Sequence, residues 1–500
     1  MRRFSIIVLS LSIALFCLFV SFNGAVAQTS GELTPAAVFD ELARQSGNKT
    51  AYARIITDNP EAWYARWHML SNAKKSIDTT YFIVDKDVFG MAFLGLLLKK
   101  AKEGVKVRLM MDARGSKDLS HKMLGQDFLQ ELLEVPGVEV KVYNPITSNL
   151  LSMFGNLANV VSSNHDKIII VDNEYVVTGG RNIEMNYFVD PKDFPRAYRD
   201  TDVIFKGPAA AVQIQKAFDE EFNSHSVSDV KRELFGNWVS RAKELEFARR
   251  AMESYICGIG LVNAQIVDKD FEKYIKELSE YKNLQSFSGY TPFSGDHQYP
   301  FLMLDKNSMK GTRNDITPGI GAMIRSAKSE IIIQNPYVVL TAEAMDALRE
   351  ANARGVKINV HTNSPMSTDS TATQVFFTDE WAKVMKELPN MRTFVFPGPQ
   401  PLHSKVFVFD REITVIGSYN MDPLSQQINS EIVGVIKSKN FALRTALRIM
   451  EDEKRSIEYK IEVMKDGSVK IINGPENHSD PKKLEKLHKL QKFGFLRPLI

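Results

Sequence analysis

The sequence predicts an α/β protein of two pseudosymmetric lobes, each a mixed, mostly parallel sheet flanked by helices. Helical and β-branched segments alternate along the chain, and four segments of the first half return in the same order in the second. A short polar motif also occurs once in each half, at the same place in the repeat. If the lobes meet with these motifs opposed, the active site lies at the lobe interface.

The first 27 residues are predicted to be a secretory signal peptide. Arg2 and Arg3 precede an apolar run over residues 4–20, and a small-x-small sequence ends at Ala27, where cleavage is expected. The alternative is an uncleaved anchor helix, because the apolar run is near the length that spans a bilayer. We therefore expect an exported protein, periplasmic or secreted, with membrane association as a further expectation.

Composition limits the classes of function. Loss of residues 1–27 removes two arginines and no acids, so the net charge falls from +3 to +1, and 473 residues remain for two domains or one bilobal unit. This near-neutral balance gives no electrostatic footprint for nucleic acid. Cys17 leaves with the signal peptide, so Cys257 has no intrachain partner. No Cys/His spacing suits zinc, and no metal or cofactor is expected.

The internal repeat defines the predicted organisation. The paired segments are 71–84 with 325–339, 98–109 with 349–360, 138–143 with 391–396, and 165–182 with 403–420. In the second pair an amphipathic helix ends at Gly104 or Gly355 and a β-branched strand follows. The predicted parts are a signal peptide (1–27), lobe 1 (50–225), a connector (226–308), lobe 2 (309–450) and a C-terminal hairpin with a basic tail (451–500).

Two regions outside the repeat are given finer predictions. The connector is predicted to hold helices over 227–256 and 268–281, then a Gly/Pro/aromatic loop over 287–301. The tail is predicted to hold a hairpin around Gly467 and a basic amphipathic segment over 482–492. That segment is interpreted as a solvated surface helix, with anionic lipid binding as the alternative.

The motif in each repeat has the pattern H-x-K-x4-D. Its residues are His165, Lys167 and Asp172 in the first copy and His403, Lys405 and Asp410 in the second. A given histidine meets Lys and Asp at these offsets roughly once in three hundred by composition, so one match is weak. Two matches at equivalent places in a repeat are strong evidence for a shared chemical role.

The spacing predicts a β-hairpin in each copy. Two β-rich runs flank a polar turn, and a two-residue turn at 173–174 places Asn182 directly across from His165, about 5 Å away. The second copy pairs His403 with Asn420 in the same way. Period-two alternation puts each motif lysine on the face of its histidine.

The two motif aspartates fall at the other end of these hairpins. Asp172 and Asp410 lie near the turns, roughly 20 Å along the strand from the histidines. We therefore expect them to shape or anchor the hairpins, with no contact to substrate.

Duplicate His, Lys and Asn side chains suit a phosphodiester. Lysine ammonium groups neutralise its charge, and asparagine amides donate to its oxygens. One imidazole can attack phosphorus while the other protonates the leaving oxygen and then deprotonates the incoming water or alcohol. Each imidazole also needs a carboxylate on its other nitrogen. Asp200 and Glu431, which both enter strands after the motifs, are the candidates; the alternative is that they are solvated strand-end charges.

The duplicated H-x-K-x4-D-x6-G-[GS]-x-N pattern resembles the phospholipase D superfamily, over roughly residues 55–450. The segments Tyr198–Asp202 and Gly417–Pro423 are similar to its cardiolipin synthase-like branch, which includes bacterial phospholipase D enzymes. The resemblance implies a phosphodiester hydrolase or phosphatidyltransferase that acts on phospholipids through a phosphohistidine. It implies His165 as nucleophile, His403 as general acid/base, phosphate binding by Lys167, Lys405, Asn182 and Asn420, and orientation of the histidines by Asp200 and Glu431.

Phospholipid is the expected substrate, with peripheral membrane contact and a monomeric chain. The export signal, the near-zero charge and an apolar lead-in over residues 150–161 favour it, although that lead-in equally suits a helix packed on its own lobe. A secreted nuclease of the same superfamily is the main alternative, and an inactive anion-binding protein is a second. Hydrolysis and transfer to an alcohol both remain open.

Overall fold

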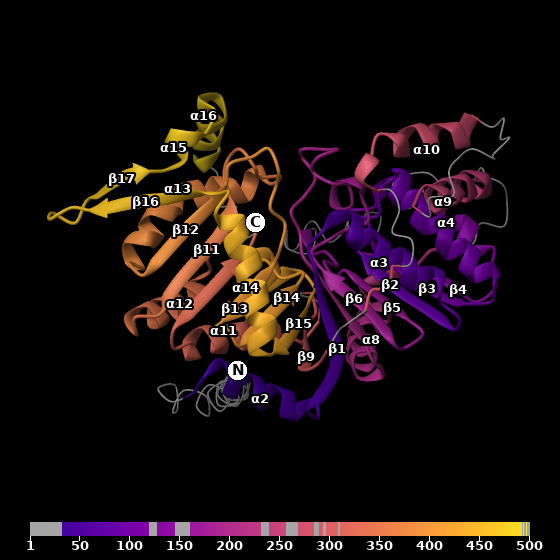
Figure 1. Cartoon of the computed structure of the whole chain (residues 1–500), viewed down its shortest axis with the longest axis horizontal. Coiled ribbons are helices and arrows are strands. Elements are labelled where there is room, and N and C mark those ends of the chain that lie inside the picture. Colours follow the sequence, from indigo (N-terminus) through magenta and orange to yellow (C-terminus); the bar gives the residue numbers. More distant parts are fainter. Residues whose placement is uncertain are drawn as a thin grey trace, which may run out of the picture.

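The computed structural model describes residues 33–119, 128–145, 161–231, 240–256, 269–284, 290–293, 297–308 and 311–492, with Gly494 and Arg497. Helices flank a mixed sheet that runs through the width of the molecule, with the two halves of the chain at its two ends (Figure 1). The predicted α/β class with a helix-flanked mixed sheet is confirmed.

The first half builds its sheet from a parallel and an antiparallel set. β2 (Ser76–Tyr81), β3 (Lys106–Asp112) and β4 (Val138–Tyr143) are parallel neighbours, and β5 (Ile168–Val171), β6 (Tyr175–Gly179) and β7 (Asp202–Lys206) extend antiparallel from β2. β8 (Val227–Asp229) pairs with β4. The helices are α3 (Asn59–Ser71), α4 (Val88–Lys102), α5 (Phe128–Leu133), α8 (Pro208–Phe222), α9 (Ala242–Ile256) and α10 (Lys269–Ser279).

The second half repeats this order. β10 (Glu330–Gln334), β11 (Lys357–Asn363) and β12 (Met391–Phe396) are parallel, and β13 (Val406–Phe409), β14 (Ile413–Gly417) and β15 (Glu431–Lys437) extend antiparallel from β10. The helices are α11 (Ile316–Ser326), α12 (Ala342–Ala353), α13 (Thr371–Glu387) and α14 (Lys439–Glu453), and α2 (Pro35–Gln45) packs against α11. In both halves the parallel ladders are formed by three adjacent strands.

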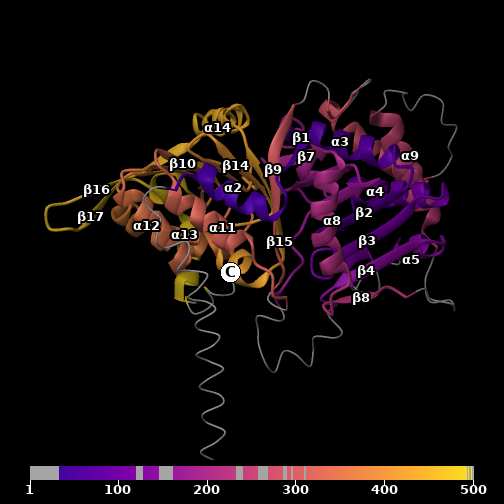
Figure 2. The same ribbon diagram turned by 90° about the horizontal axis from the view of Figure 1, so that it is seen from below.

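The two halves join through a central pair of antiparallel strands. β1 (Lys49–Ile56) pairs with β7 and with β9 (Gln298–Lys306), and β9 pairs with β15. β1 precedes α3 and β9 precedes α11, so the two strands occupy equivalent places in the repeat. In the view from below, β9 and β15 lie between the helices of the two halves (Figure 2).

Two sequence predictions around the connector are wrong. The predicted loop over 287–301 includes the first residues of β9, and the predicted helix from residue 227 begins instead with β8. Pro300 lies inside β9, opposite Thr50 of β1, and a proline at such a place reads as a loop from sequence alone. β9 therefore belongs with the second repeat in the structure.

A shared core makes the halves one packed body. Phe205 and Ile168 of the first half pack in one cluster with Ile332 and Val408 of the second, all buried. All four residues of β5 and all four of β13 are buried, as expected of strands covered on both faces. The motif hairpins are thus fixed by core packing on both sides of the sheet.

The motif hairpins have a register one residue different from the prediction. β5 pairs Val171 with Tyr175, so the loop has three residues, and Asp172 and Asn173 both adopt positive φ. The second hairpin is the same, with positive φ at Asp410 and Arg411. The ladders end at residues 168 and 406, so the predicted cross-strand pairing of each histidine with its asparagine is wrong.

The structure places the two motif aspartates at the hairpin tips. The Asp172 carboxylate accepts hydrogen bonds from the backbone N–H groups of Lys74, Lys75 and Ser76, at the start of β2. Asp410 does the same at the start of β10, and the Ser329 hydroxyl adds a further donor at 2.8 Å. Each aspartate ties its hairpin to the neighbouring parallel strand.

The C-terminal region contains the predicted hairpin and helix. β16 (Ile457–Val463) pairs with β12 and with β17 (Val469–Asn473), followed by α15 (Pro475–His478) and α16 (Pro481–Leu490). Leu484 and Leu487 of α16 are buried against Val375 of α13. The apolar face of this helix is therefore occupied by the protein itself.

Several sequence predictions fall outside the described residues. They are the signal peptide, most of the apolar lead-in over 150–161, and both cysteines. Among the helices that the structure describes, none has the length and apolar character needed to cross a bilayer.

Candidate active site

The segment before each motif histidine crosses to the opposite half. The backbone N–H of His165 donates to the carbonyl of Ser430 at 3.3 Å, and that of Ser430 donates to Ser163 at 3.1 Å. On the other side, His403 donates to Arg199 at 2.8 Å. These short parallel pairings place His165 beside Glu431, which follows Ser430 in the chain. They place His403 beside Asp200, which follows Arg199.

His165 is paired with a carboxylate from the second half. Its Nδ1 lies 3.0 Å and 3.1 Å from the two carboxylate oxygens of Glu431. A carboxylate is an acceptor only, so Nδ1 carries the hydrogen and Nε2 keeps its lone pair. Glu431 is fully buried and also accepts from the hydroxyls of Ser418 and Ser425. Burial acts to raise the pKa of Glu431, but His165, Lys167 and the Ser418 hydroxyl together hold it below its usual value.

His403, in the second half, is paired with a carboxylate from the first half. Its Nδ1 lies 2.8 Å from Oδ2 of Asp200, which is fully buried. Burial acts to raise the pKa of Asp200, but the charge and hydrogen bond of His403 hold it below its usual value. Gly180 makes room for this carboxylate, because a Cβ there would lie 2.2 Å from Oδ1 of Asp200. The residue equivalent to Gly180 in the second motif is Ser418, whose hydroxyl binds Glu431.

The two motif lysines lie at the same centre. Lys167 Nζ donates to the backbone carbonyl of His165 at 2.7 Å, and Lys405 Nζ to that of His403 at 2.5 Å. Burial lowers the pKa of Lys167 to about 7 and that of Lys405 to about 8, although nearby carboxylates oppose the change. Lys405 contributes to the lowered pKa of Lys167, so the two ammonium groups interact across the halves.

Burial favours the neutral form of both imidazoles. Burial lowers the pKa of His165 to about 4; Glu431 opposes this shift, and both motif lysines add to it. Burial, and then Lys405 at 2.9 Å from Nδ1, lower the pKa of His403. A buried neutral imidazole with a free Nε2 is suited to nucleophilic attack or to proton uptake.

The motif asparagines are buried near these groups but are not cross-strand partners of the histidines. Asn182 accepts from the N–H of Ile83 at 3.2 Å and donates to the hydroxyl of Tyr187, whose ring lies 5.2 Å from that of His403. Asn420 is 5% exposed, and its Oδ1 has no hydrogen-bond partner among the described residues. Arg181, beside Asn182, is fully buried and donates to backbone carbonyls and to Asp202, which is a structural role.

Sequence reasoning missed the residues that support this centre. Asp112 and Asn363, at the ends of β3 and β11, accept from the N–H of Asn164 and Leu402, just ahead of the motif histidines. Their positions at the carboxyl ends of equivalent parallel strands were a usable signal. The serines that bind Glu431 carried no such signal, because hydroxyl residues are common in loops.

A buried acidic pair lies behind the first motif. Asp166, between the motif histidine and lysine, has no hydrogen-bond partner for either carboxylate oxygen among the described residues. Burial, and then Asp305, raise the pKa of Asp166 well above its usual value; burial raises that of Asp305 to about 7. At the equivalent place the second motif has Ser404, which bonds the hydroxyl of Thr201 at 2.9 Å.

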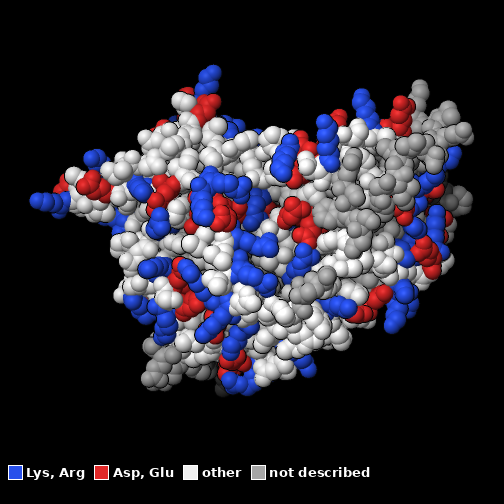
Figure 3. Space-filling view, viewed as in Figure 1, with Lys and Arg blue, Asp and Glu red and all other residues white. Residues whose placement is uncertain are grey.

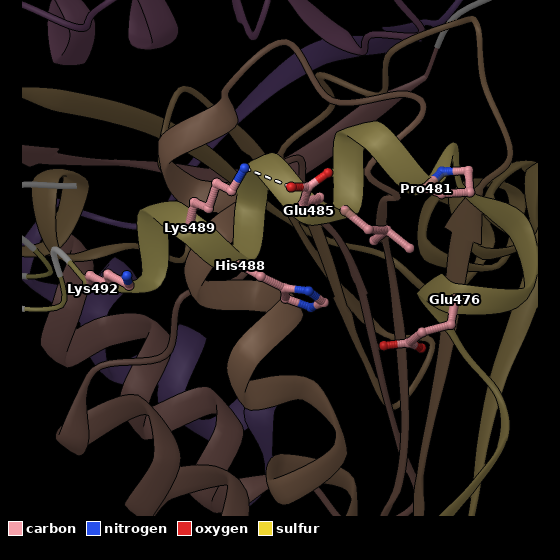
Figure 4. Close-up of a pocket in the computed structure, with 7 residues that line it drawn as sticks. Glu476, Pro481, Glu485, His488, Lys489 and Lys492 are labelled. Carbon is pink, nitrogen blue, oxygen red and sulfur yellow. Dashed lines mark ion pairs between the residues drawn. The ribbon is translucent and has the colours of Figure 1, made fainter.

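An open hollow beside α16 lies apart from the motifs. It is lined by Glu476, Pro481, Leu484, Glu485, His488, Lys489 and Lys492, with an ion pair of 2.6 Å between Glu485 and Lys489 (Figure 4). No motif residue contributes to it. Within the described ranges, no group of His, Cys, Asp and Glu side chains is placed to hold a metal ion.

Two histidine–carboxylate pairs exchanged between repeated halves, with a lysine beside each, define a site of the phospholipase D superfamily. Residues 67–224 and 320–451 match the family described as cardiolipin synthase, PLD-like domain, and the chain belongs to this family.

Named relatives and one solved structure are similar to the chain. It is 26% identical over 421 residues to cardiolipin synthase 1 of Bacillus anthracis, covering 83% of this chain and 69% of the relative. It is 26% identical over 424 residues to cardiolipin synthase C of Escherichia coli (strain K12), covering 79% and 83%. The crystal structure of a phosphatidylserine synthase from Haemophilus influenzae Rd KW20 has the same fold, with a TM-score of 0.60 at 12% identity over 92% of this chain and 99% of that one.

Proposed function

We propose that the protein is a phosphatidyltransferase or phospholipase D that acts on phospholipids through a covalent phosphohistidine. The observation that carries the proposal is the crossed pairing of His165 with Glu431 and of His403 with Asp200, with a motif lysine beside each imidazole. The names of the cardiolipin synthase relatives support a phospholipid substrate.

The first step forms the covalent intermediate. Nε2 of His165 attacks phosphorus, the P–N bond forms, and the bond from phosphorus to the head-group oxygen breaks. His403, once it has taken up a proton at Nε2, gives that proton to the leaving oxygen. Glu431 and Asp200 hold the Nδ1 hydrogens and balance the charge that develops on each ring. Lys167 and Lys405 offset the negative charge on the non-bridging oxygens.

The second step releases the product. His403, now neutral, takes a proton from water or from an alcohol, whose oxygen attacks phosphorus while the P–N bond breaks. Water yields phosphatidic acid, and a lipid hydroxyl yields a new phosphodiester lipid. The choice between water and alcohol depends on how far the site excludes water from the phosphohistidine intermediate.

The pKa of His165 is compatible with the role of nucleophile. With a pKa of about 4, its Nε2 is unprotonated at neutral pH, as attack on phosphorus requires. We further propose that the protein is exported by cleavage after Ala27 and acts as a monomer in peripheral contact with a membrane.

The test compares lipid with nucleic acid. Purified protein is incubated with phosphatidylglycerol, phosphatidylethanolamine and single-stranded DNA, and products are identified by mass spectrometry. We expect lipid turnover that is lost in both His165→Ala and His403→Ala. DNA cleavage with no lipid turnover would instead establish the nuclease alternative.

A further inference from the structure

The His403 side of the centre is lined by tyrosines and a carboxylate. Rings of Tyr187, Tyr198 and Tyr337 lie 5.2 Å, 5.5 Å and 6.3 Å from the ring of His403. The hydroxyl of Tyr337 donates to both carboxylate oxygens of Asp369, at 2.8 Å and 2.9 Å. Burial, and then Asp369, raise the pKa of Tyr198, so the charge of Asp369 acts on a second ring beside His403.

Asp369 is placed to receive a cation. It is exposed, in the loop between β11 and α13, and has no ion pair with Lys or Arg among the residues described here. Its charge reaches both His403 and Lys405, and it opposes the lowering of their pKa values. The hydroxyl of Tyr337 leaves part of the carboxylate's acceptor capacity for a ligand. The exposed Arg196 acts to lower the pKa of Tyr198. It forms no ion pair with Asp369 among the described residues.

A second carboxyl group contributes to the same rim. Glu184 is partly buried, and burial, followed by Asp85 and Asp369, raises its pKa to about 7. A cation near Glu184 would be favoured, because it would offset the repulsion between the carboxylates of Glu184, Asp85 and Asp369. The centre thus has lysines within and carboxyl groups with aromatic rings at its His403 side.

Among the described residues, no such tyrosine lies beside His165. Its aromatic neighbour is Phe82, 5.5 Å from the imidazole, which has no hydroxyl to hold a carboxylate. Because nucleophile and leaving group lie on opposite sides of phosphorus, the head-group alcohol lies on the His403 side when His165 attacks. The polar and aromatic lining therefore meets the alcohol, both as it leaves and as a new one enters.

We propose that Tyr198, Tyr337 and Asp369 form a subsite for an ammonium group carried by the leaving or entering alcohol. The preferred head groups are therefore amino alcohols such as ethanolamine, joined to phosphate in a zwitterion. Aromatic faces and a carboxylate together recognise an ammonium ion, and the lysines recognise the phosphate beside it. This inference rests on the proposed phospholipid activity and names its substrate class.

The experiment measures kcat/KM for phosphatidylethanolamine and phosphatidylglycerol in vesicles that contain equal amounts of both. We expect the wild-type protein to prefer phosphatidylethanolamine. Asp369→Asn should lower the ratio of kcat/KM for phosphatidylethanolamine to kcat/KM for phosphatidylglycerol about tenfold, the size of one cation contact, because any effect of its charge on His403 and Lys405 is common to both lipids. Asp379→Asn removes the same charge from the nearby α13 and should change neither value.

A second variant and an acceptor assay complete the test. Tyr337→Phe keeps the ring but removes the hydrogen bond to Asp369, and should reproduce part of the loss. With phosphatidylglycerol as donor, added free ethanolamine should be captured as acceptor more efficiently by the wild type than by Asp369→Asn. Turnover of both lipids without preference, or equal losses for both in Asp369→Asn, would overturn this inference alone. Failure to turn over any phospholipid would overturn the proposed function, and the inference with it.

Discussion

The two motif regions share their chemistry and differ in their surroundings. In both, Nδ1 of the histidine meets a buried carboxylate from the other half, and the lysine binds the backbone of its own histidine. Near His165 the aromatic neighbour is Phe82; near His403 there are three tyrosines. The repeat conserved the reacting groups within this one chain while the environments diverged, so the two histidines need not have equal roles.

The crossed pairing also explains why the repeat stays together. Each imidazole takes its carboxylate from the opposite half, so neither half alone contains a complete histidine–carboxylate pair. The central pair of strands, β1 and β9, and the core shared by both halves hold this exchange in register. The site depends on the interface as much as on the motifs.

The largest expected effect comes from removing either histidine. His165→Asn and His403→Asn should each lower lipid turnover by roughly 10³-fold or more, as for groups that act as a unit. The roles of the two histidines can be separated with a substrate whose leaving alcohol is acidic enough to depart without a proton. His403→Asn should then still form the covalent phospho-enzyme, because the attacking Nε2 of His165 is intact.

Acid-quenched protein analysed by mass spectrometry measures that adduct. His165→Asn is the matched control and should show none with the same substrate. An adduct on His403 in the His165 variant would reverse the assigned roles.

Much of this centre could be predicted from sequence because its residues recur. The same spacing in two repeats identified His165, Lys167, His403 and Lys405 as members of one chemical unit, and the structure brings them together. Strands that enter at Asp200 and Glu431 made these carboxylates candidates. Their exchange between halves could not be predicted, because the partners are 203 and 266 residues apart and no local pattern encodes that contact.

The errors were local in origin. A period-two pattern does not distinguish a two-residue from a three-residue loop, and the positive φ of Asp172 and Asn173 shifts the register by one. Pro300 concealed β9 in the same way. The tyrosines around His403 come from three separate segments, so only the fold gathers them.

The second largest effect is expected from substitution of the two carboxylates that orient the histidines. Glu431→Gln and Asp200→Asn should each reduce kcat by about 10²- to 10⁴-fold, since the amide no longer stabilises the imidazolium or fixes its tautomer. Glu431→Gln should slow formation of the covalent intermediate. Asp200→Asn should slow head-group departure, and that defect should shrink with an acidic leaving alcohol.

Single-turnover kinetics with both substrates provide the measurement. Ser425→Ala is the control, because it removes one hydrogen bond to Glu431 and keeps the charge, so its loss should be much smaller. Equal losses with both substrates in both carboxylate variants would show that the two pairs do not divide the reaction.

The motif lysines, together with the general acid His403, should set the alkaline limit of activity. Their pKa values of about 7 for Lys167 and about 8 for Lys405 are lowered, so each loses its charge as the pH rises through these values. We expect kcat/KM, which reports the free enzyme, to fall above about pH 7 by roughly tenfold per unit for each proton lost. The acid limit should lie near pH 4, where His165 becomes protonated.

A pH profile of kcat/KM from pH 4 to 10 tests this sign. Bound phosphate favours the charged lysines, so the kcat profile should extend to higher pH than the kcat/KM profile. Lys405→Arg keeps its charge over this range and should flatten the alkaline fall. A wild-type kcat/KM that stays constant to pH 9 would contradict the lysine assignment.

The smallest effect concerns the residue between histidine and lysine, Asp166 in one motif and Ser404 in the other. Raised pKa values of Asp166 and of Asp305, about 7 for the latter, mean that folding favours their protonated forms. The stability that goes with those protons is present below the unfolded pKa, near 4, and is lost as the pH rises through the folded values.

Asp166→Ser gives the first motif the residue of the second. It should raise the free energy of unfolding by roughly 1 kcal/mol at pH 8 and change it little at pH 5. Urea denaturation at the two pH values measures this difference, with Ser404→Ala as the variant whose effect should not depend on pH. Equal destabilisation by Asp166→Ser at both pH values would show that the buried acid contributes through packing and not through its proton.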